Sequence, residues 1–503
     1  MKHFPNLLLS LALILAATLM SPSVGFSQQK PLTLDEIRAA LLDSKAGLPT
    51  TNLALIKQID EQGISFEISA ENEKLLRESG ATDNLIAAVR EAICAAFVLE
   101  AERCKEEDFA CILRNYDKAL AVHPDDPLVL FSRGALKLDA DDHDGAIKDF
   151  TEVIRIDSTA VDAWSNRALA YLKKNELTLS LADYNKAIEL DPDVAGYYLN
   201  RGLIRFDQKE YDLAINDFTK VLASEPRDVL ALTYRGHSYG EKAMYPAALK
   251  DLMKAISIKP DLVDAYVARG RVYGSTNRID LAMRDFEKAV KLDPKDAVAL
   301  YNRGFTFFRL NQLEKALDDF DAALKLDAEL GSAIYADRGD VLVALKFYDR
   351  ALADYDRALR HDPKDAMTLC RRGELQTLRH QYITAILDFT SAIEIDKTNL
   401  RAYFGRGVVY EEIEDHEKAM RDFDRVLELS PNYPAALVNR AVVFLNTGKP
   451  ADAIVASTAA IKSDPKDWTA FDIRAQAYEK IGDANKAAAD RKQVEVLKKK
   501  AKP

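Results

Sequence analysis

An arginine recurs along most of this 503-residue chain at a nearly constant spacing, always followed by glycine or alanine. The arginines stand at residues 133, 167, 201, 235, 269, 303, 338, 372, 406, 440 and 474, so every interval is 34 residues except one of 35. An aspartate follows ten of these eleven arginines at a distance of sixteen residues. Guanidinium and carboxylate groups at a fixed spacing predict a ladder of ion pairs. Arg303 is expected to pair with Asp319 of its own copy or with Asp285 of the copy before.

The same arginines offer a different chemistry if their charge is free, namely a track for a polyanion. Two observations argue against it. The near one-for-one match with aspartates indicates that the charge is compensated, and the net charge of -11 with a pI near 5.4 argues against nucleic-acid binding. We therefore interpret the arginines as structural and expect no nucleic-acid partner. If the pairs are partly buried, loss of one partner is expected to cost about 3 to 5 kcal/mol.

Residue patterns for catalysis are missing from the chain. The seven histidines are scattered, and the sequence contains no HExxH, GxxxxGK or GxSxG motif. We expect no catalytic residue, no metal site and no cofactor. An alternative is an enzyme subunit whose activity lies in the N-terminal part of the chain.

The arginine period extends to other residues and defines a repeat. With arginine counted as position 7, position 8 is Gly in eight copies and Ala in three, position 20 is Ala in ten, position 24 is aromatic in eight, and position 32 is Pro in seven. Positions 8 and 24 lie on the apolar stripes of two helices separated by a turn. In such a hairpin the small residue faces the aromatic one, so Gly304 is expected to form a socket for Phe320.

A 34-residue period with these positions resembles the tetratricopeptide repeat. The second copy carries Trp164, Ala168 and Tyr171, and the fifth carries Tyr266, Gly270, Phe286 and Pro294. The resemblance implies an all-α fold, a right-handed superhelical α-solenoid of about eleven to twelve helix-turn-helix repeats, and covers residues 127–501. The copies begin near residues 127, 161, 195, 229, 263, 297, 332, 366, 400, 434 and 468. One departure is consistent, because the family's Leu at position 7 is Arg in every copy.

The resemblance also implies a concave groove, built from the first helix of each repeat, that binds a protein or an extended peptide. The expected groove residues include the aromatic side chains Phe131, Phe206, Tyr301, Phe305, Phe308 and Phe404. Position 6 is asparagine at Asn166, Asn200, Asn302 and Asn439. An asparagine amide can both donate and accept, and in some members of the family asparagines at this position hold bound peptide. The alternative is that these four are solvated polar residues without a role.

The chain ahead of the repeats divides into three segments. Residues 1–27 have the charged start, the apolar stretch and the small residues of an export signal that is cleaved. Residues 28–92 are expected to form a small helical module that precedes the array, with a capping box from Thr33 and Glu36. Residues 93–126 are interpreted as a degenerate hairpin of the same repeat.

Two of the four cysteines fall at facing positions of that degenerate hairpin. Cys104 is at position 12 and Cys111 at position 19, on either side of the turn, so we expect a disulfide between them, which an exported chain permits. Two free thiols are the alternative.

Taken together, these features favour a non-catalytic scaffold that is exported to the periplasm or secreted. It is expected to bind a protein or extended peptide in assembly of a cell-envelope or secretion complex, with no integral membrane segment in the mature chain. If the N-terminus is not cleaved, the alternative is an intracellular adaptor.

Overall fold

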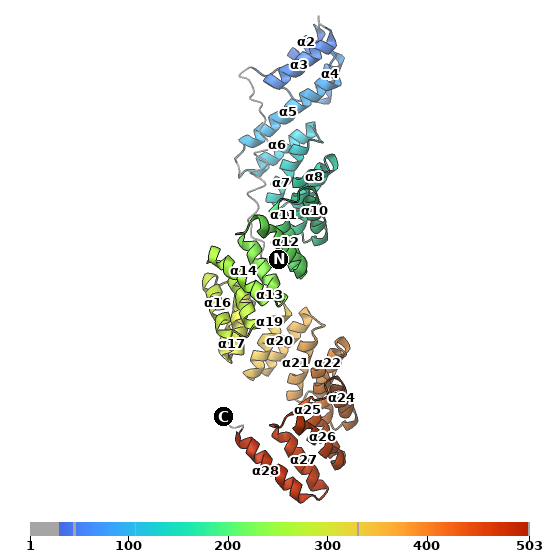
Figure 1. Cartoon of the computed structure of the whole chain (residues 1–503). Coiled ribbons are helices and arrows are strands. Elements are labelled where there is room, and N and C mark those ends of the chain that lie inside the picture. The colour runs from blue at the N-terminus through green and yellow to red at the C-terminus, as the bar shows by residue number, and fades with distance from the viewer. Residues whose placement is uncertain (1–29, 44–46, 106, 329–330, 501–503) are drawn as a thin grey trace. The chain divides into compact units, whose positions relative to one another are not determined.

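The computed structural model describes residues 30–43, 47–105, 107–328 and 331–500. Within these ranges the chain forms 27 helices, α2 to α28, and no strand, apart from one isolated bridge between Leu32 and Ile64 (Figure 1). The all-α prediction is confirmed. The expected export signal, residues 1–27, lies outside the described residues.

The chain divides into two compact units, Met1–Lys259 and Pro260–Pro503. Both are built from helical hairpins, and each hairpin consists of a first helix and a second helix of similar length. In the first unit the hairpins that follow the N-terminal part are α7 (Pro127–Asp139) with α8 (His143–Ile156), α9 (Val161–Lys173) with α10 (Leu177–Leu190), α11 (Ala195–Asp207) with α12 (Tyr211–Ser224), and α13 (Val229–Glu241) with α14 (Tyr245–Ile258).

The second unit consists of seven further hairpins. They are α15 (Val263–Ser275) with α16 (Ile279–Leu292), α17 (Ala297–Arg309) with α18 (Leu313–Leu326), α19 (Ser332–Ala344) with α20 (Tyr348–His361), α21 (Ala366–Leu378) with α22 (Tyr382–Ile395), α23 (Leu400–Glu412) with α24 (His416–Leu429), α25 (Pro434–Asn446) with α26 (Pro450–Ser463), and α27 (Trp468–Lys480) with α28 (Ala484–Lys500).

The turn inside each of these hairpins has the same backbone geometry. Three residues separate the two helices, and the middle one adopts a left-handed conformation, for example Asn311 with φ 57° and Gly448 with φ 73°. The next amide then donates back across the helix end, as from Gln312 to the carbonyl of Phe307 at 2.9 Å. This pairing satisfies carbonyls that the helix end would otherwise leave open, and it reverses the chain within a few residues.

Small residues at position 8 let the two helices of a hairpin approach closely. A Cβ added to Gly304 would lie 3.0 Å from the Phe320 ring, and one added to Gly270 would lie 2.6 Å from Cε1 of Phe286. Phe320 itself is fully buried. The glycine therefore provides the space that the aromatic ring fills.

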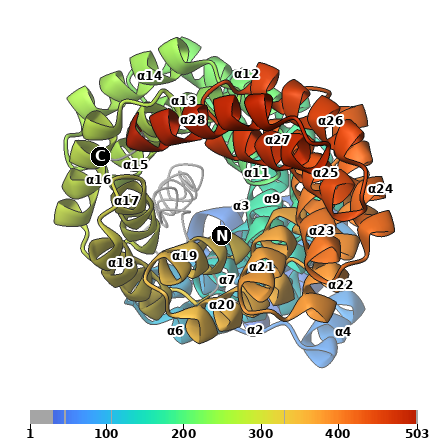
Figure 2. The same cartoon turned by 90° about the horizontal axis from the view of Figure 1, so that it is seen from below.

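First helices of successive repeats contact one another within each unit, as α17 contacts α19 and α19 contacts α21. Second helices make far fewer contacts with each other. Figure 2 shows the resulting arrangement in the second unit, where α22, α24 and α26 lie outside α21, α23 and α25. Within each unit the first helices thus lie together on one side of the two-helix repeats of an α-solenoid, and we call this side the first-helix face.

The N-terminal module packs around its own apolar core. Its helices are α2 (Leu34–Leu42), α3 (Leu48–Gln62), α4 (Ala70–Glu78) and α5 (Asp83–Arg103). Thr33 caps α2 with a capping box that includes Glu36. Ile37, Leu76 and Val89 are completely buried in this core. Helix α5 continues through residues 92 and 93, because the sequence contains no proline or glycine there that would end it. The module and the first hairpin therefore share one helix.

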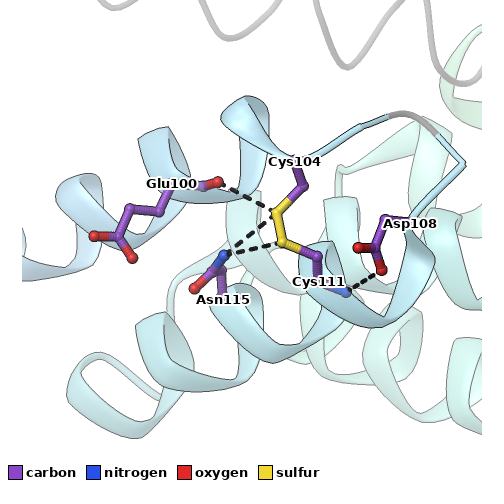
Figure 3. The surroundings of a disulfide bond; sticks show 5 residues. All are labelled: Glu100, Cys104, Asp108, Cys111 and Asn115. Atoms are coloured by element: carbon purple, nitrogen blue, oxygen red, sulfur yellow. Dashed lines mark hydrogen bonds between the residues drawn. A yellow bond between two sulfur atoms is a disulfide. The ribbon is translucent and has the colours of Figure 1, made fainter.

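That first hairpin consists of α5 and α6 (Phe109–Val122), and its turn differs from all later ones. Among the described residues of this turn, none has a positive φ. Instead, a disulfide joins Cys104 at the end of α5 to Cys111 in the first turn of α6, with the Cα atoms 6.0 Å apart (Figure 3). The Asn115 amide lies 3.6 Å from Sγ of Cys104. A covalent link holds the two helix ends where the later hairpins use backbone geometry.

Candidate functional site

The recurring arginines lie on the first helices and bind the aspartates of their own repeat. In each of ten repeats the guanidinium contacts the carboxylate through two parallel hydrogen bonds. For Arg303 these run from Nε to Oδ2 of Asp319 at 2.8 Å and from Nη2 to Oδ1 at 2.7 Å. Asp285 is bound by Arg269 in the same way. Arg303 therefore pairs within its repeat, and the pair with Asp285 does not form.

The remaining nitrogen, Nη1, reaches the preceding repeat in most copies. Arg201 donates to Asn185 at 2.6 Å, Arg338 to Asp321 at 2.6 Å and Arg406 to Thr390 at 3.0 Å. Each acceptor is at position 25, two residues after the aspartate of its own repeat. The arginine thus holds together two helices of one hairpin and two neighbouring repeats. The frequent Asp, Thr and Asn at position 25 are the sequence signal for this second contact.

Burial and pairing keep these charges in place. The side chain of Asp319 is 9% exposed and that of Arg303 is 24% exposed. The hydrogen bond to Asp319 raises the pKa of Arg303, and this outweighs the opposing effect of burial. The guanidinium charge is therefore neutralised inside the hairpin, which is unsuitable for a polyanion track.

The four asparagines at position 6 lie half-buried on the first-helix face. In three of them Nδ2 donates to the carbonyl four residues earlier in the same helix, from Asn166 to Asp162 at 2.8 Å, from Asn302 to Val298 at 2.7 Å and from Asn439 to Ala435 at 2.8 Å. Each of these bonds uses one N–H, so the second N–H and Oδ1 are left for other partners.

Three of the expected groove aromatics pack mainly against neighbouring rings. The ring centroids of Phe131 and Phe150 lie 5.6 Å apart, and those of Phe404 and Phe423 lie 6.0 Å apart. Phe206 contacts Tyr234 edge-on at 5.2 Å. These side chains join adjacent helices and keep part of their surface on the first-helix face.

The three expected groove aromatics of α17 differ in exposure. Phe308 is half-buried against the core of its repeat, and Tyr301 is half-buried with its hydroxyl bonded to Asp337 at 2.8 Å. Phe305 is 38% exposed. Phe305 is therefore the most exposed aromatic side chain of α17.

A charged network that sequence reasoning did not identify lies on the first-helix face of the second unit. Arg371 of α21 contacts Asp337 at 3.4 Å and Asp340 at 3.3 Å, both on α19. Tyr301 donates to Asp337, and Tyr355 donates to Asp340 at 2.7 Å. Burial raises the pKa of both carboxyl groups above the usual value for aspartate. In these two successive repeats Asp337 and Arg371 occupy position 6, where four other repeats carry asparagine.

Two further properties concern the described ranges only. No group of three or more His, Cys, Asp or Glu side chains there is arranged to hold a metal ion. No helix in that part of the chain combines the length and the apolar character needed to cross a membrane.

Family models for the tetratricopeptide repeat match several segments of the chain. One model matches residues 161–194, 297–329 and 400–433, and others match residues 195–228, 270–311 and 336–399. The matches at 161, 195, 297 and 400 begin at the first residues of α9, α11, α17 and α23. The chain is a tetratricopeptide repeat protein. The resemblance inferred from its sequence is confirmed.

Solved structures similar to this tetratricopeptide protein include the Cut9–Hcn1 heterotetramer of the APC/C, with 17% identity over 88% of this chain and 96% of that chain and a TM-score of 0.49. A tetratricopeptide repeat protein from Parabacteroides merdae matches with 20% identity over 46% of this chain and 92% of that one, with a TM-score of 0.41. YrrB, described as having an unusual peptide-binding site, matches with 25% identity over 37% of this chain and 95% of its own, with a TM-score of 0.33. No curated protein matches the chain.

Proposed function

We propose that this tetratricopeptide protein is an exported scaffold that binds extended segments of partner proteins along its first-helix face, in assembly of a cell-envelope or secretion complex. The observation that carries the binding proposal is the hydrogen-bonding capacity that asparagine amides on that face keep free. Asn166, Asn302 and Asn439 each keep one N–H and one carbonyl oxygen available. A peptide group offers the complementary acceptor and donor, so such contacts do not depend on the partner's side chains.

Apolar contacts supplement these hydrogen bonds. Phe305 is the most open aromatic of its repeat, and Phe131 and Phe404 keep part of their surface at the same face. Burial of aromatic surface supplies most of the affinity in interfaces of this kind, and the amides fix the direction of the bound chain. The charged groups around Arg371 are already paired with one another. We therefore place the contacts with the partner's backbone at the repeats that carry asparagine at position 6.

Export is supported by the N-terminal sequence and by the Cys104–Cys111 disulfide. Structural disulfides persist in oxidising compartments and are rare in the cytosol. The mass of the mature chain tests this part of the proposal. If the chain is cleaved near residue 27, the measured mass should lack residues 1–27. A mature chain that retains residues 1–27 would instead favour the intracellular adaptor.

An array of immobilised peptides of unrelated sequence tests the binding mode. The variant with both Asn166→Ala and Asn200→Ala is expected to lose affinity for all peptides that bind, whatever their side chains, because the contacts are made to the backbone. Asn216→Ala is the matched control, since Asn216 is exposed on the second helix α12 of the same repeat as Asn200. Unchanged binding by a folded double variant would rule out the amide contacts.

A further inference from the structure

One arginine of the ladder lacks the aspartate that the other ten bind in their own repeat. Arg440 of α25 is followed sixteen residues later by Ala456 of α26, which offers no carboxylate. Among the described residues its one ion pair joins Nε to Oδ1 of Asp424 on α24, at 3.1 Å. Asp424 stands at position 25 of the preceding repeat. Arg440 therefore keeps the contact between repeats and lacks the contact within its own hairpin.

Three other arginines show how two carboxylates fit around one guanidinium. Each binds the aspartate at position 23 of its own repeat and a second aspartate at position 25 of the repeat before. These are Arg133 with Asp149 and Asp117, Arg338 with Asp354 and Asp321, and Arg372 with Asp388 and Asp356. Arg440 has only the second of these two carboxylates. Its surroundings therefore correspond to a site for two carboxylates in which the chain supplies one.

The guanidinium of Arg440 is also the most open of the ladder. Its side chain is 36% exposed, whereas the ten arginines that bind an aspartate of their own repeat are between 12% and 24% exposed. Nε is buried and makes no hydrogen bond of good geometry. Nη1 and Nη2 donate no hydrogen bond to a described residue either, and they are open to solvent. The two terminal nitrogens can therefore be reached from outside the hairpin.

The residues around Arg440 position its side chain without supplying a second acceptor. The ring of Phe444 packs against it, with Cζ of Arg440 5.5 Å from the ring centroid. Ser457 stands at position 24, where eight copies have an aromatic side chain, and its hydroxyl donates to the carbonyl of Ala453. Among the described residues of α26, no side chain takes the place of the missing carboxylate.

We propose that Arg440 is a binding site for a carboxylate supplied by a partner protein, the side chain of a glutamate or an aspartate. The carboxylate accepts hydrogen bonds from Nη1 and Nη2 and provides the second negative charge that Arg133, Arg338 and Arg372 find within the chain. The planar fork of a guanidinium favours such a paired contact with a carboxylate. This site does not depend on the asparagine contacts, because Arg440 is paired with the second helix α24 and not with a neighbouring first helix.

Modification by phenylglyoxal, a reagent for accessible guanidinium groups, tests this inference on the full chain. Peptide mass spectrometry after short exposure gives the rate at each arginine. Arg440 is expected to react roughly tenfold or more faster than the other ten arginines of the ladder, because each of those must first break hydrogen bonds to a carboxylate. Ala456→Asp supplies a carboxylate within the chain, and we expect it to slow the reaction of Arg440 to the rate of the other ten. Ala456→Asn, the uncharged control, should slow it less.

The ligand is tested on the wild type with N-acetylglutamate α-amide, which carries a single side-chain carboxylate. It is expected to slow modification of Arg440 in proportion to occupancy, roughly twofold when half of the sites are filled. N-acetylglutamine amide, which has nearly the same shape and no charge, should have no effect at the same ionic strength. Arg421 is the control for a general effect, because it is exposed and already paired with Glu417.

Three outcomes would overturn the inference. A wild-type rate at Arg440 equal to that of the ten paired arginines would show that its guanidinium is not available. Equal protection of Arg440 and Arg421 would show a general effect of the added compound. Stronger protection by N-acetylglutamine, whose carboxylate represents a chain end, would contradict the assignment to an acidic side chain. None of these results depends on the peptide array, so this inference and the proposed function can fail separately.

Discussion

The arginine at position 7 stands where the family has leucine. It stabilises the fold by binding several groups at once. A leucine would fill space between two helices only. Arg338 binds Asp354 of its own repeat through two nitrogens and Asp321 of the preceding repeat through the third. Lysine offers a point charge rather than a planar fork and would not reproduce these three contacts.

Two glycines of α15 allow a direct test of the socket at position 8. A Cβ on Gly270 would lie 2.6 Å from the Phe286 ring, whereas one on Gly274 would meet nothing within 4 Å. We expect Gly270→Ala to destabilise the protein by about 1 to 2 kcal/mol, because overpacking outweighs the better helix propensity of alanine. Gly274→Ala, the matched control on the same helix, should be neutral or stabilising by up to about 1 kcal/mol. Urea denaturation measures both, and equal effects would contradict the socket.

The carboxyl group of Asp337 predicts a pH dependence. Burial raises its pKa above the usual value, so the folded protein holds this proton more tightly than the unfolded chain does. Its contribution to stability is then present below about pH 4 and is lost as the pH rises through the raised pKa. Asp337→Asn removes the charge and restores the residue found at this position in other repeats. We expect this variant to have a higher urea midpoint than the wild type at neutral pH, with a difference that shrinks on acidification. A difference in urea midpoint that grows on acidification would contradict this prediction.

At the scale of the element, the hairpin is defined by its turn. The later hairpins reverse direction through a residue with positive φ, and Lys209 and Ala243 adopt this conformation although it favours glycine or asparagine. The tight packing at positions 8, 20 and 24 therefore determines the turn more strongly than the turn residue does. The first hairpin departs from the spacing of the later copies, and none of the described residues of its turn is left-handed, so the disulfide holds its two helix ends instead.

Loss of that disulfide should loosen the N-terminal hairpin only. Replacing Cys104 and Cys111 by Ala is expected to destabilise the α5–α6 hairpin by up to about 2.5 kcal/mol, the chain-entropy value for so short a loop. Hydrogen exchange should become faster at the end of α5 and the start of α6, and remain unchanged in α9 and α10. Addition of a reducing agent should reproduce this in the wild type and have no effect on the variant. Wild-type exchange rates in the variant would show that packing alone holds the hairpin.

At the scale of the whole molecule, the contacts are those of an array. Helices contact the partner in their own hairpin and the helices of adjacent repeats, and no pair of distant repeats shares a core within either unit. Stability is then approximately a sum of repeat terms and neighbour terms. Local damage is expected to remain local.

Arg303→Ala tests this expectation. It leaves the carboxylate of Asp319 buried without its partner, and we expect a local loss of about 3 kcal/mol, the lower end for a buried pair because a quarter of Arg303 is exposed. Hydrogen exchange should become faster in α17, α18 and their neighbours and stay unchanged in α7 and α8. The control is Arg421→Ala on α24, since Arg421 and its partner Glu417 are both largely exposed. Uniform acceleration across the chain would show a cooperative globule instead of an array.

The sequence by itself determined the repeat, the all-helical fold and the family, because a fixed period, small residues at positions 8 and 20 and an aromatic at position 24 permit only one kind of hairpin. It also named the members of the ion-pair ladder and both cysteines of the disulfide. The groove residues stay a prediction.

Other features were decided by the tertiary structure alone. The choice of Asp319 over Asp285, the contact of most of the arginines with position 25 of the preceding repeat, and the network around Arg371 all involve side chains from different helices. Their distances depend on how neighbouring helices pack. Sequence periodicity records which residues share a helix face, and it carries no information on the offset between one helix and the next.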